Sequence, residues 1–262
     1  MKSTREPAVA GMFYPSDPEE LRQEVLSFLA AAGVERGKPP KAIVAPHAGY
    51  IYSGPVAATA YAQLAMRAEE ISRVMLFGPS HRVAFSGLAY SAADTFLTPL
   101  GPIPVDRAAY ESIGDLPQVR RLEAPFEGEH CLEVQLPFLQ LILEGFRIVP
   151  FLVGDADTEE VAQVMERLWG GDETLIVISS DLSHYMDYDS AKAIDAETSR
   201  AIEGLHPEAI GYNQACGRNP LNGLLREARL HGLEARTLDL RNSGDTAGPR
   251  NQVVGYGAYA FS

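Results

Sequence analysis

Four apolar runs predict strands that are buried on both faces, as in a parallel sheet covered by helices. Each is short, rich in branched residues and bounded by proline, glycine or polar residues. The runs are AIVA at 42–45, RVMLF at 73–77, FRIVPFLV at 146–153 and TLIVISS at 174–180. The stretch between the first two runs has helical spacing, so these runs and their connection predict a βαβ unit.

The spacing of apolar residues and the capping residues predict six helices. Asp17, Asp157, Asp189 and Asn219 are the expected caps of four of them, and Gly232 is expected to end the last. The other two are expected to begin at Gly54-Pro55 and to span 131–143. Pro137 should kink the second of these or mark a start one turn later.

Alternating stretches at 87–91 and 101–105 are expected to form a hairpin or edge strands, and 234–240 and 253–261 two late strands. Residues 5–15 have no clear period and are expected to form an extended arm. No internal repeat or linker divides the chain. We therefore expect one α/β domain over residues 1–262, with a mixed, mainly parallel sheet flanked by helices.

Three of the six histidines lie within four residues of the end of a predicted strand: His47, His81 and His184. Ligands bind at the carboxyl ends of parallel strands, where loops converge on a rigid platform. His47 and His81 could therefore bind one metal ion, since imidazole suits zinc, iron, copper and nickel. A single histidine more often bonds to nearby backbone, but the repeated placement favours a metal site.

Other candidate residues leave alternatives open. Asp181 could hold His184 in one tautomer as part of an acid/base pair, or it could cap a turn. Cys216 could be a working thiol or a small buried residue. The cluster Glu129, His130, Cys131 and Glu133 could line the same cleft or flank the start of a helix.

The composition of the chain argues against several classes of function. The net charge of −13 argues against nucleic-acid binding, which needs a basic face. No apolar run approaches the ~20 residues that span a bilayer, and the amino terminus lacks the apolar core of a signal peptide, so we expect a cytoplasmic protein without membrane contact. Two cysteines cannot form a disulfide framework in 262 residues. Nucleotide-binding and serine-hydrolase motifs are missing.

Six ordered motifs resemble the Memo family, whose prokaryotic members are called AmmeMemoRadiSam system protein B. The closing VGYGAYAF fits as well, so the resemblance covers nearly the whole chain. The motifs are PAVAGMFYP at 7–15, APHAGYIYSG at 45–54, FGPSH at 77–81, EHCLEVQLPFLQ at 129–140, SSDLSHY at 179–185 and ACGRNP at 215–220.

This resemblance implies a fold similar to that of class III extradiol dioxygenases, which are non-haem iron enzymes. It also implies an iron or copper site, with zinc as a further candidate, held by His47, His81 and Cys216 with Asp181 and His184 nearby. The thiolate departs from the two-histidine, one-carboxylate iron site of those dioxygenases and favours softer metals. Catechol cleavage therefore does not follow from the fold. A second departure is Cys131, where this family is expected to have a small hydroxyl residue.

The leading hypothesis is a metal-dependent oxidoreductase that acts on a small molecule or peptide in the strand-end cleft. His184 would be its acid/base and Asp181 would orient His184. One alternative is a binding protein without turnover, which holds a peptide or metal and acts beside a radical-SAM protein. The other is a metal-dependent hydrolase, against which the thiolate argues.

Overall fold

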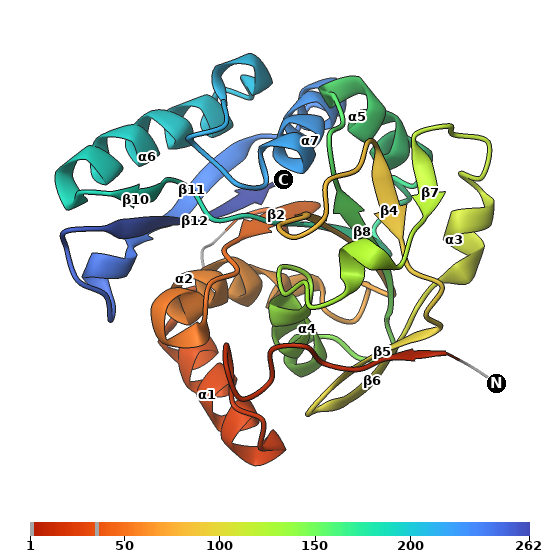
Figure 1. Cartoon of the computed structure of the whole chain (residues 1–262), viewed down its shortest axis with the longest axis horizontal. Coiled ribbons are helices and arrows are strands. Elements are labelled where there is room, and N and C mark those ends of the chain that lie inside the picture. Colours follow the sequence, from red (N-terminus) through yellow and green to blue (C-terminus); the bar gives the residue numbers. More distant parts are fainter. Residues whose placement is uncertain (1–2, 35–36) are drawn as a thin grey trace.

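A mixed sheet of nine strands runs through the part of the chain that this computed structural model describes, residues 3–34 and 37–262 (Figure 1). Its strands follow the order β10 (His184–Met186), β12 (Val253–Phe261), β2 (Ala42–Ala45), β9 (Thr174–Ser179), β3 (Arg73–Pro79), β8 (Arg147–Val153), β4 (Leu88–Tyr90) and β7 (Val119–Arg121), and β11 (Ala235–Asn242) also pairs with β12. The predicted α/β fold with a mixed sheet flanked by helices is confirmed, although the described strand pairs of this sheet are parallel and antiparallel in equal number.

The four central strands are parallel and in close register. Ala45 in β2 lies opposite Ser179 in β9, and Phe77 in β3 lies between Ile178 of β9 and Phe151 of β8. The carboxyl ends of β2, β9 and β3 therefore meet at one edge of the sheet. The loops that carry the predicted site residues begin at this edge.

Helices cover both faces of the sheet (Figure 1). On one side lie α1 (Pro18–Ala31), α2 (Tyr50–Ala62) and α4 (Leu136–Ile142), and on the other α5 (Thr158–Arg167), α6 (Tyr188–Glu203) and α7 (Arg218–Leu230). The short α3 (Arg107–Glu111) packs on β8. Single 3₁₀ turns are formed by Gln63–Arg67, Ala124–Phe126, Glu133–Gln135, Pro207–Ala209 and Ser243–Asp245.

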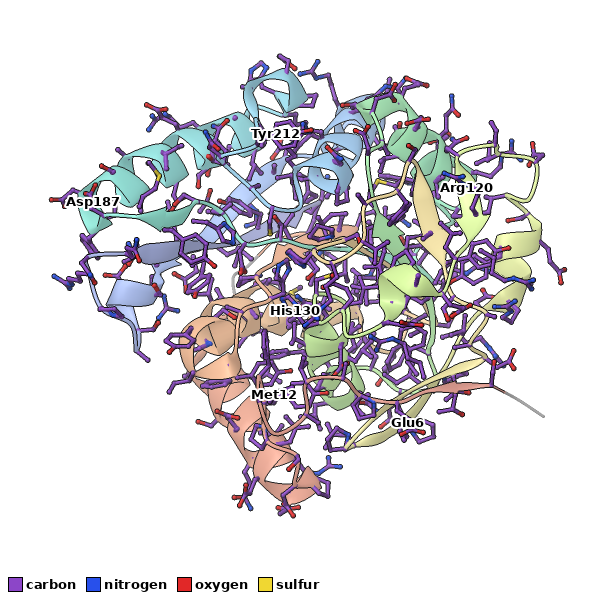
Figure 2. All side chains as sticks on the ribbon, in the orientation of Figure 1. Glu6, Met12, Arg120, His130, Asp187 and Tyr212 are labelled. Atoms are coloured by element: carbon purple, nitrogen blue, oxygen red, sulfur yellow. The ribbon has the colours of Figure 1, made fainter. Side chains whose placement is uncertain are left out.

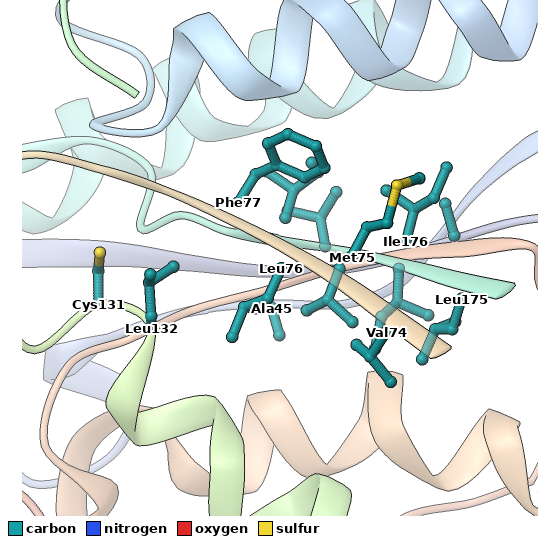
Figure 3. Packing of buried hydrophobic residues seen from close by; sticks show 14 of the residues in the cluster. Ala45, Val74, Met75, Leu76, Phe77, Cys131, Leu132, Leu175 and Ile176 are labelled. Atoms are coloured by element: carbon teal, nitrogen blue, oxygen red, sulfur yellow. The ribbon is translucent and has the colours of Figure 1, made fainter. Parts of the chain in front are cut away.

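The central strands are buried on both faces, as their unbroken apolar character predicts. Met75 and Phe77 point toward one helical layer and Val74 toward the other (Figure 3), and all three side chains are fully buried. Such two-sided burial supplies most of the free energy that favours this core, at roughly 1.5–3 kcal/mol for each large apolar side chain. The sheet is therefore a rigid platform for the loops at its edge.

The stretches 87–91 and 101–105 do not form the hairpin that was one of two expected outcomes, and only the second of them is an edge strand, which was the other. Strand β4 instead joins the main sheet between β8 and β7. The second stretch forms β6 (Gly101–Pro104), which pairs with β5 (Thr95–Thr98), and β1 (Thr4–Arg5) from the predicted amino-terminal arm completes this smaller sheet. Alternation indicates a strand but does not specify its partner.

Three predicted helix starts are corrected. Helix α2 begins at Tyr50, so Pro55 lies inside it. The side chain of Asp187, not Asp189, caps α6 by accepting from the Ser190 N–H, and α7 begins after Gly217. Asn219 instead donates from Nδ2 to the Gly154 carbonyl oxygen, at 2.8 Å.

Other predicted boundaries are confirmed. Asp17 and Asp157 cap α1 and α5, and Gly232, with a φ of 68°, follows the end of α7. Leu136 begins α4 with Pro137 in its first turn, which is one of the two expected outcomes for that proline. None of the described helices is long and apolar enough to cross a membrane.

Candidate metal centre

The imidazole of His47 is buried and held in one tautomer. Its Nδ1 lies 2.9 Å from the hydroxyl oxygen of Ser179. That hydroxyl donates its only proton to the Cys131 carbonyl oxygen, at 2.6 Å, and accepts from Nε2 of Gln135, at 2.8 Å. The Ser179 oxygen must therefore accept from His47, which places the imidazole proton on Nδ1 and leaves the Nε2 lone pair free.

The carboxylate of Glu129 orients the second histidine in the same way. Its Oε1 lies 2.9 Å from Nδ1 of His81, and its Oε2 accepts from the His81 backbone N–H at 2.7 Å. Oε1 also accepts from the N–H groups of His130 and Cys131. Burial alone would raise the pKa of Glu129, but the hydrogen bonds from His81 prevail and hold this pKa well below its usual range. Ionised Glu129 therefore accepts from His81 Nδ1, which leaves Nε2 of His81 free.

His130 joins His47 and His81 to form a compact group of three imidazoles, which we call the histidine cluster. The potential ligand atoms of the three rings lie within 4.8 Å of one another. The ring centroids are 4.9 Å apart for His81 and His130, and 5.1 and 5.4 Å from His47 to His81 and His130. Figure 2 shows His130 near the middle of the molecule, beside α2 and α4.

Cys216 and Asp181 flank the His47 ring. The Cys216 Sγ lies 3.3 Å from Nε2 of His47, on the side of the ring that carries the free lone pair. Asp181 accepts from the His47 backbone N–H at 2.7 Å, and its own N–H points at Cys216 Sγ, at 3.3 Å. Gly217 allows this approach, because a Cβ there would lie 2.7 Å from the Ser180 Cβ. Asp181 thus holds the backbone of His47 and the sulfur atom of Cys216.

His184 faces the same cleft without joining the cluster. The Leu182 carbonyl oxygen, 2.8 Å from His184 Nδ1, orients its ring instead of Asp181. The cleft has a volume of about 1020 Å³, and aromatic side chains line much of it. Tyr185 and Tyr212 are largely exposed there, at 73% and 79%. A carbonyl partner places the proton on Nδ1 of His184 and leaves Nε2 able to accept a proton from a ligand.

The residues of the histidine cluster and Cys216 suit a transition-metal ion. Burial lowers the pKa of His47 and of His130, so these two rings are uncharged donors, and it raises the pKa of the Cys216 thiol. The potential ligand atoms of the three rings lie close together, and two of the rings are oriented from behind by Ser179 and Glu129 as metal-bound histidines usually are. Binding of a cation to Cys216 would release the thiol proton. The donor set of imidazoles and a thiol fits iron, copper or zinc.

The structure brings together all five residues singled out in the sequence. His47, His81, Asp181, His184 and Cys216 line one cleft, although only the first two belong to the histidine cluster. His130 was left open in the sequence because it follows a loop rather than a predicted strand. The sequence feature that could have identified His130 is its acidic neighbour Glu129, which bonds to both His81 and the His130 backbone.

Cys131 lies behind the cluster. Its side chain is fully buried, and Sγ is 3.1 Å from the Pro79 carbonyl oxygen, to which it donates. Burial raises the pKa of this thiol well above its usual value. Of the two roles left open in the sequence, this geometry favours a packed position over a redox partner.

Asp195 contacts the loop that follows β9, and its burial predicts how the stability of the protein depends on pH. It accepts from the Ser183 N–H at 3.0 Å, and a side chain at Gly255 would collide with it. Burial raises the pKa of Asp195 from 3.8 to about 6, against the opposing effect of the Ser183 hydrogen bond. The folded protein therefore binds this proton more tightly than the unfolded chain, and this contribution to stability is lost as pH rises through 6.

We expect Asp195→Asn to become more stable relative to the native protein at high pH. The free energy of unfolding of the variant minus that of the native protein should rise by about 1 kcal/mol between pH 5 and pH 8. Urea denaturation of both proteins at the two pH values measures this difference. A difference that stays constant would show that Asp195 titrates alike in the folded and unfolded states.

Comparison with known proteins identifies relatives over almost the whole chain. The family model described as Memo-like protein matches residues 5–260. A MEMO1 family protein of Aquifex aeolicus is 38% identical over 264 residues, which cover 96% of this chain and 97% of the relative. MEMO1 family proteins of Methanosarcina barkeri and Aeropyrum pernix are 36% and 37% identical, each over 97% of this chain and 98% of its own length.

Proposed function

The chain belongs to the Memo-like protein family, and we propose that it is a metal-dependent oxidoreductase whose histidine cluster and Cys216 hold one iron or copper ion. The observation that carries this proposal is the convergence of three imidazoles within 4.8 Å, with a thiol 3.3 Å from one of them. Two of these rings are already fixed in the tautomer that a metal needs. When bound, such an ion would supply electron transfer and reaction with O₂.

The surrounding residues support this chemistry by binding and proton transfer. The cleft is large enough for a small molecule or a peptide side chain. Tyr52, Tyr185 and Tyr212 would pack against the apolar part of that ligand. His184 would exchange a proton with the ligand through Nε2, while the Leu182 carbonyl oxygen holds its ring. Asp181 would keep His47 and Cys216 in place.

Cys216 favours redox chemistry over hydrolysis. A thiolate donates charge to a metal and suits Cu(I), zinc and thiolate-bound iron, whereas hydrolytic sites commonly use imidazole and carboxylate. A second proposal, favoured by the wide cleft with its exposed tyrosines, is a protein that binds a peptide or a metal without turnover. A radical-SAM protein would be its partner.

Metal content and oxygen consumption together test the proposed function. After anaerobic purification, we expect close to one iron or copper per chain by mass spectrometry, and O₂ uptake with a reductant that stops when a chelator removes the metal. Cys216→Ser should reduce this O₂ uptake at least tenfold at equal metal loading. A protein that cannot be loaded with iron, copper or zinc would refute the metal site, and tight loading without O₂ uptake would favour the binding protein.

A further inference from the structure

A second group of metal-ligand residues lies where α5 packs against α7, and its members are Glu166, Glu227 and His231. Glu166 belongs to α5, Glu227 to the last turns of α7, and His231 is the residue that caps α7. One potential ligand atom from each lies within 4.8 Å of the other two. None of them belongs to the histidine cluster or to the cleft proposed above.

His231 is the centre of this group. Its Nε2 lies 2.6 Å from Oε2 of Glu166 and 3.8 Å from Oε2 of Glu227. Zinc bonds to imidazole and carboxylate are about 2.0–2.2 Å long, which sets neighbouring ligand atoms roughly 3–4 Å apart. The ring is stacked on Trp169, with centroids 3.9 Å apart and an angle of 6° between the planes, so its direction is fixed. Small side-chain movements would bring all three donors onto one ion.

Glu227 supplies an independent indication of a missing ligand. Its side chain is fully buried, and Arg226 satisfies only Oε1, by donating from Nη1 at 2.7 Å. Its Oε2 accepts no hydrogen bond from an N–H or hydroxyl group within residues 3–34 and 37–262, although it is buried too and lies 3.8 Å from Nε2 of His231. A buried carboxylate oxygen that no N–H or hydroxyl group reaches is costly, and a cation between Glu227 and His231 would reduce that cost.

The charges around the group favour a cation. Arg226 also bonds to Glu159, from Nη2 to Oε2 at 2.7 Å, so one guanidinium is shared by the carboxylates of Glu159 and Glu227, while Glu166 bonds to His231. The site opens onto a hollow of about 710 Å³ that Glu166 and Glu227 line, which gives an ion a path from solvent. Hard cations such as Mg²⁺ and Ca²⁺ prefer oxygen ligands alone, whereas an imidazole selects a transition metal.

We propose that Glu166, Glu227 and His231 form a second site, for a divalent transition-metal ion of the zinc class, that ties α5 to α7. Water would complete the coordination, because Glu166 and His231 are partly exposed. The ion would fix the carboxyl-terminal end of α7. The amino-terminal end of this helix lies two residues after Cys216. Its role would be to hold two helices together and not to take part in the chemistry of the cleft.

Zinc stoichiometry tests this second site. Metal-free native protein and Glu166→Gln/His231→Asn are dialysed against micromolar Zn²⁺, and zinc per chain is counted by mass spectrometry. The two replaced side chains are partly exposed, which favours folding of the variant, and the buried Glu227 is left in place. We expect the variant to bind one Zn²⁺ fewer than the native protein. This difference is the same whether or not the histidine cluster binds zinc, so failure of the two proposals can be told apart.

Glu159→Gln is the matched control, because Glu159 lies on the same helix and beside the same arginine but outside the ligand group. It should bind as many Zn²⁺ ions as the native protein, and Zn²⁺ should raise the Tm of both by more than that of Glu166→Gln/His231→Asn. Equal zinc in the double variant and the native protein would overturn the proposal. So would an equal loss in the control, which would indicate diffuse attraction to an acidic surface.

Discussion

His81→Ala should retain iron or copper more than about 100-fold less tightly than the native protein. The substitution removes one donor from the histidine cluster and leaves the Glu129 carboxylate behind it without its ring partner. Residues that only orient a metal ligand are typically worth 10–100-fold in affinity, so loss of the ligand itself should cost more. The metal retained after dialysis against a graded series of chelator concentrations measures this change.

His184→Ala is the matched control for that experiment. His184 lines the same cleft, but its ring bonds to the Leu182 carbonyl oxygen and lies outside the cluster. This variant should keep its metal and lose turnover. Equal retention of metal by His81→Ala and the native protein would exclude His81 as a ligand, and loss of metal in His184→Ala would show that the site extends further along the cleft.

The sequence predicted the part of the site that depends on strand ends. His47 and His81 follow apolar runs, and parallel strands in register carry both to one edge of the sheet. His130 and Glu129 lie in a loop between a 3₁₀ turn at 124–126 and another at 133–135, and no periodicity places such a loop. Cys216 was selected only by the family resemblance, because a turn before a helix has no unique position in the sequence.

The fold was predicted well where burial determines it and poorly where long-range contacts do. Proline at position 55 indicated a helix start, yet α2 begins at Tyr50 because contacts outside the helix hold its first turn. The Tyr50 N–H donates to the Phe13 carbonyl oxygen at 2.7 Å, and the Tyr50 hydroxyl donates to that of Val134, also at 2.7 Å. Both partners are remote in sequence, so local propensity could not reveal them.

Glu133→Ala should lower the free energy of unfolding by about 3–5 kcal/mol, because Glu133 is a buried charge that holds the amino-terminal arm. Its Oε2 accepts from the Ala8 N–H at 2.7 Å and from Nη1 of Arg5 at 3.3 Å. Its Oε1 accepts from the Val9 N–H at 2.9 Å and from the Tyr14 hydroxyl at 2.7 Å. Alanine would leave four donors without this acceptor and the Arg5 guanidinium without its counter-ion.

The same substitution should loosen the metal centre. Arg5 donates from Nη2 to the carbonyl oxygen of Glu129, at 2.7 Å, and Phe13 in the same arm packs on the His130 ring, with centroids 4.7 Å apart. Release of the arm would therefore free both His130 and the loop that carries Glu129. Urea denaturation and metal retention should change together in Glu133→Ala, whereas Glu127→Gln, an exposed neighbour in that loop, should change neither. A loss of stability below 1 kcal/mol would show that water replaces Glu133 as the acceptor and that the arm holds itself in place.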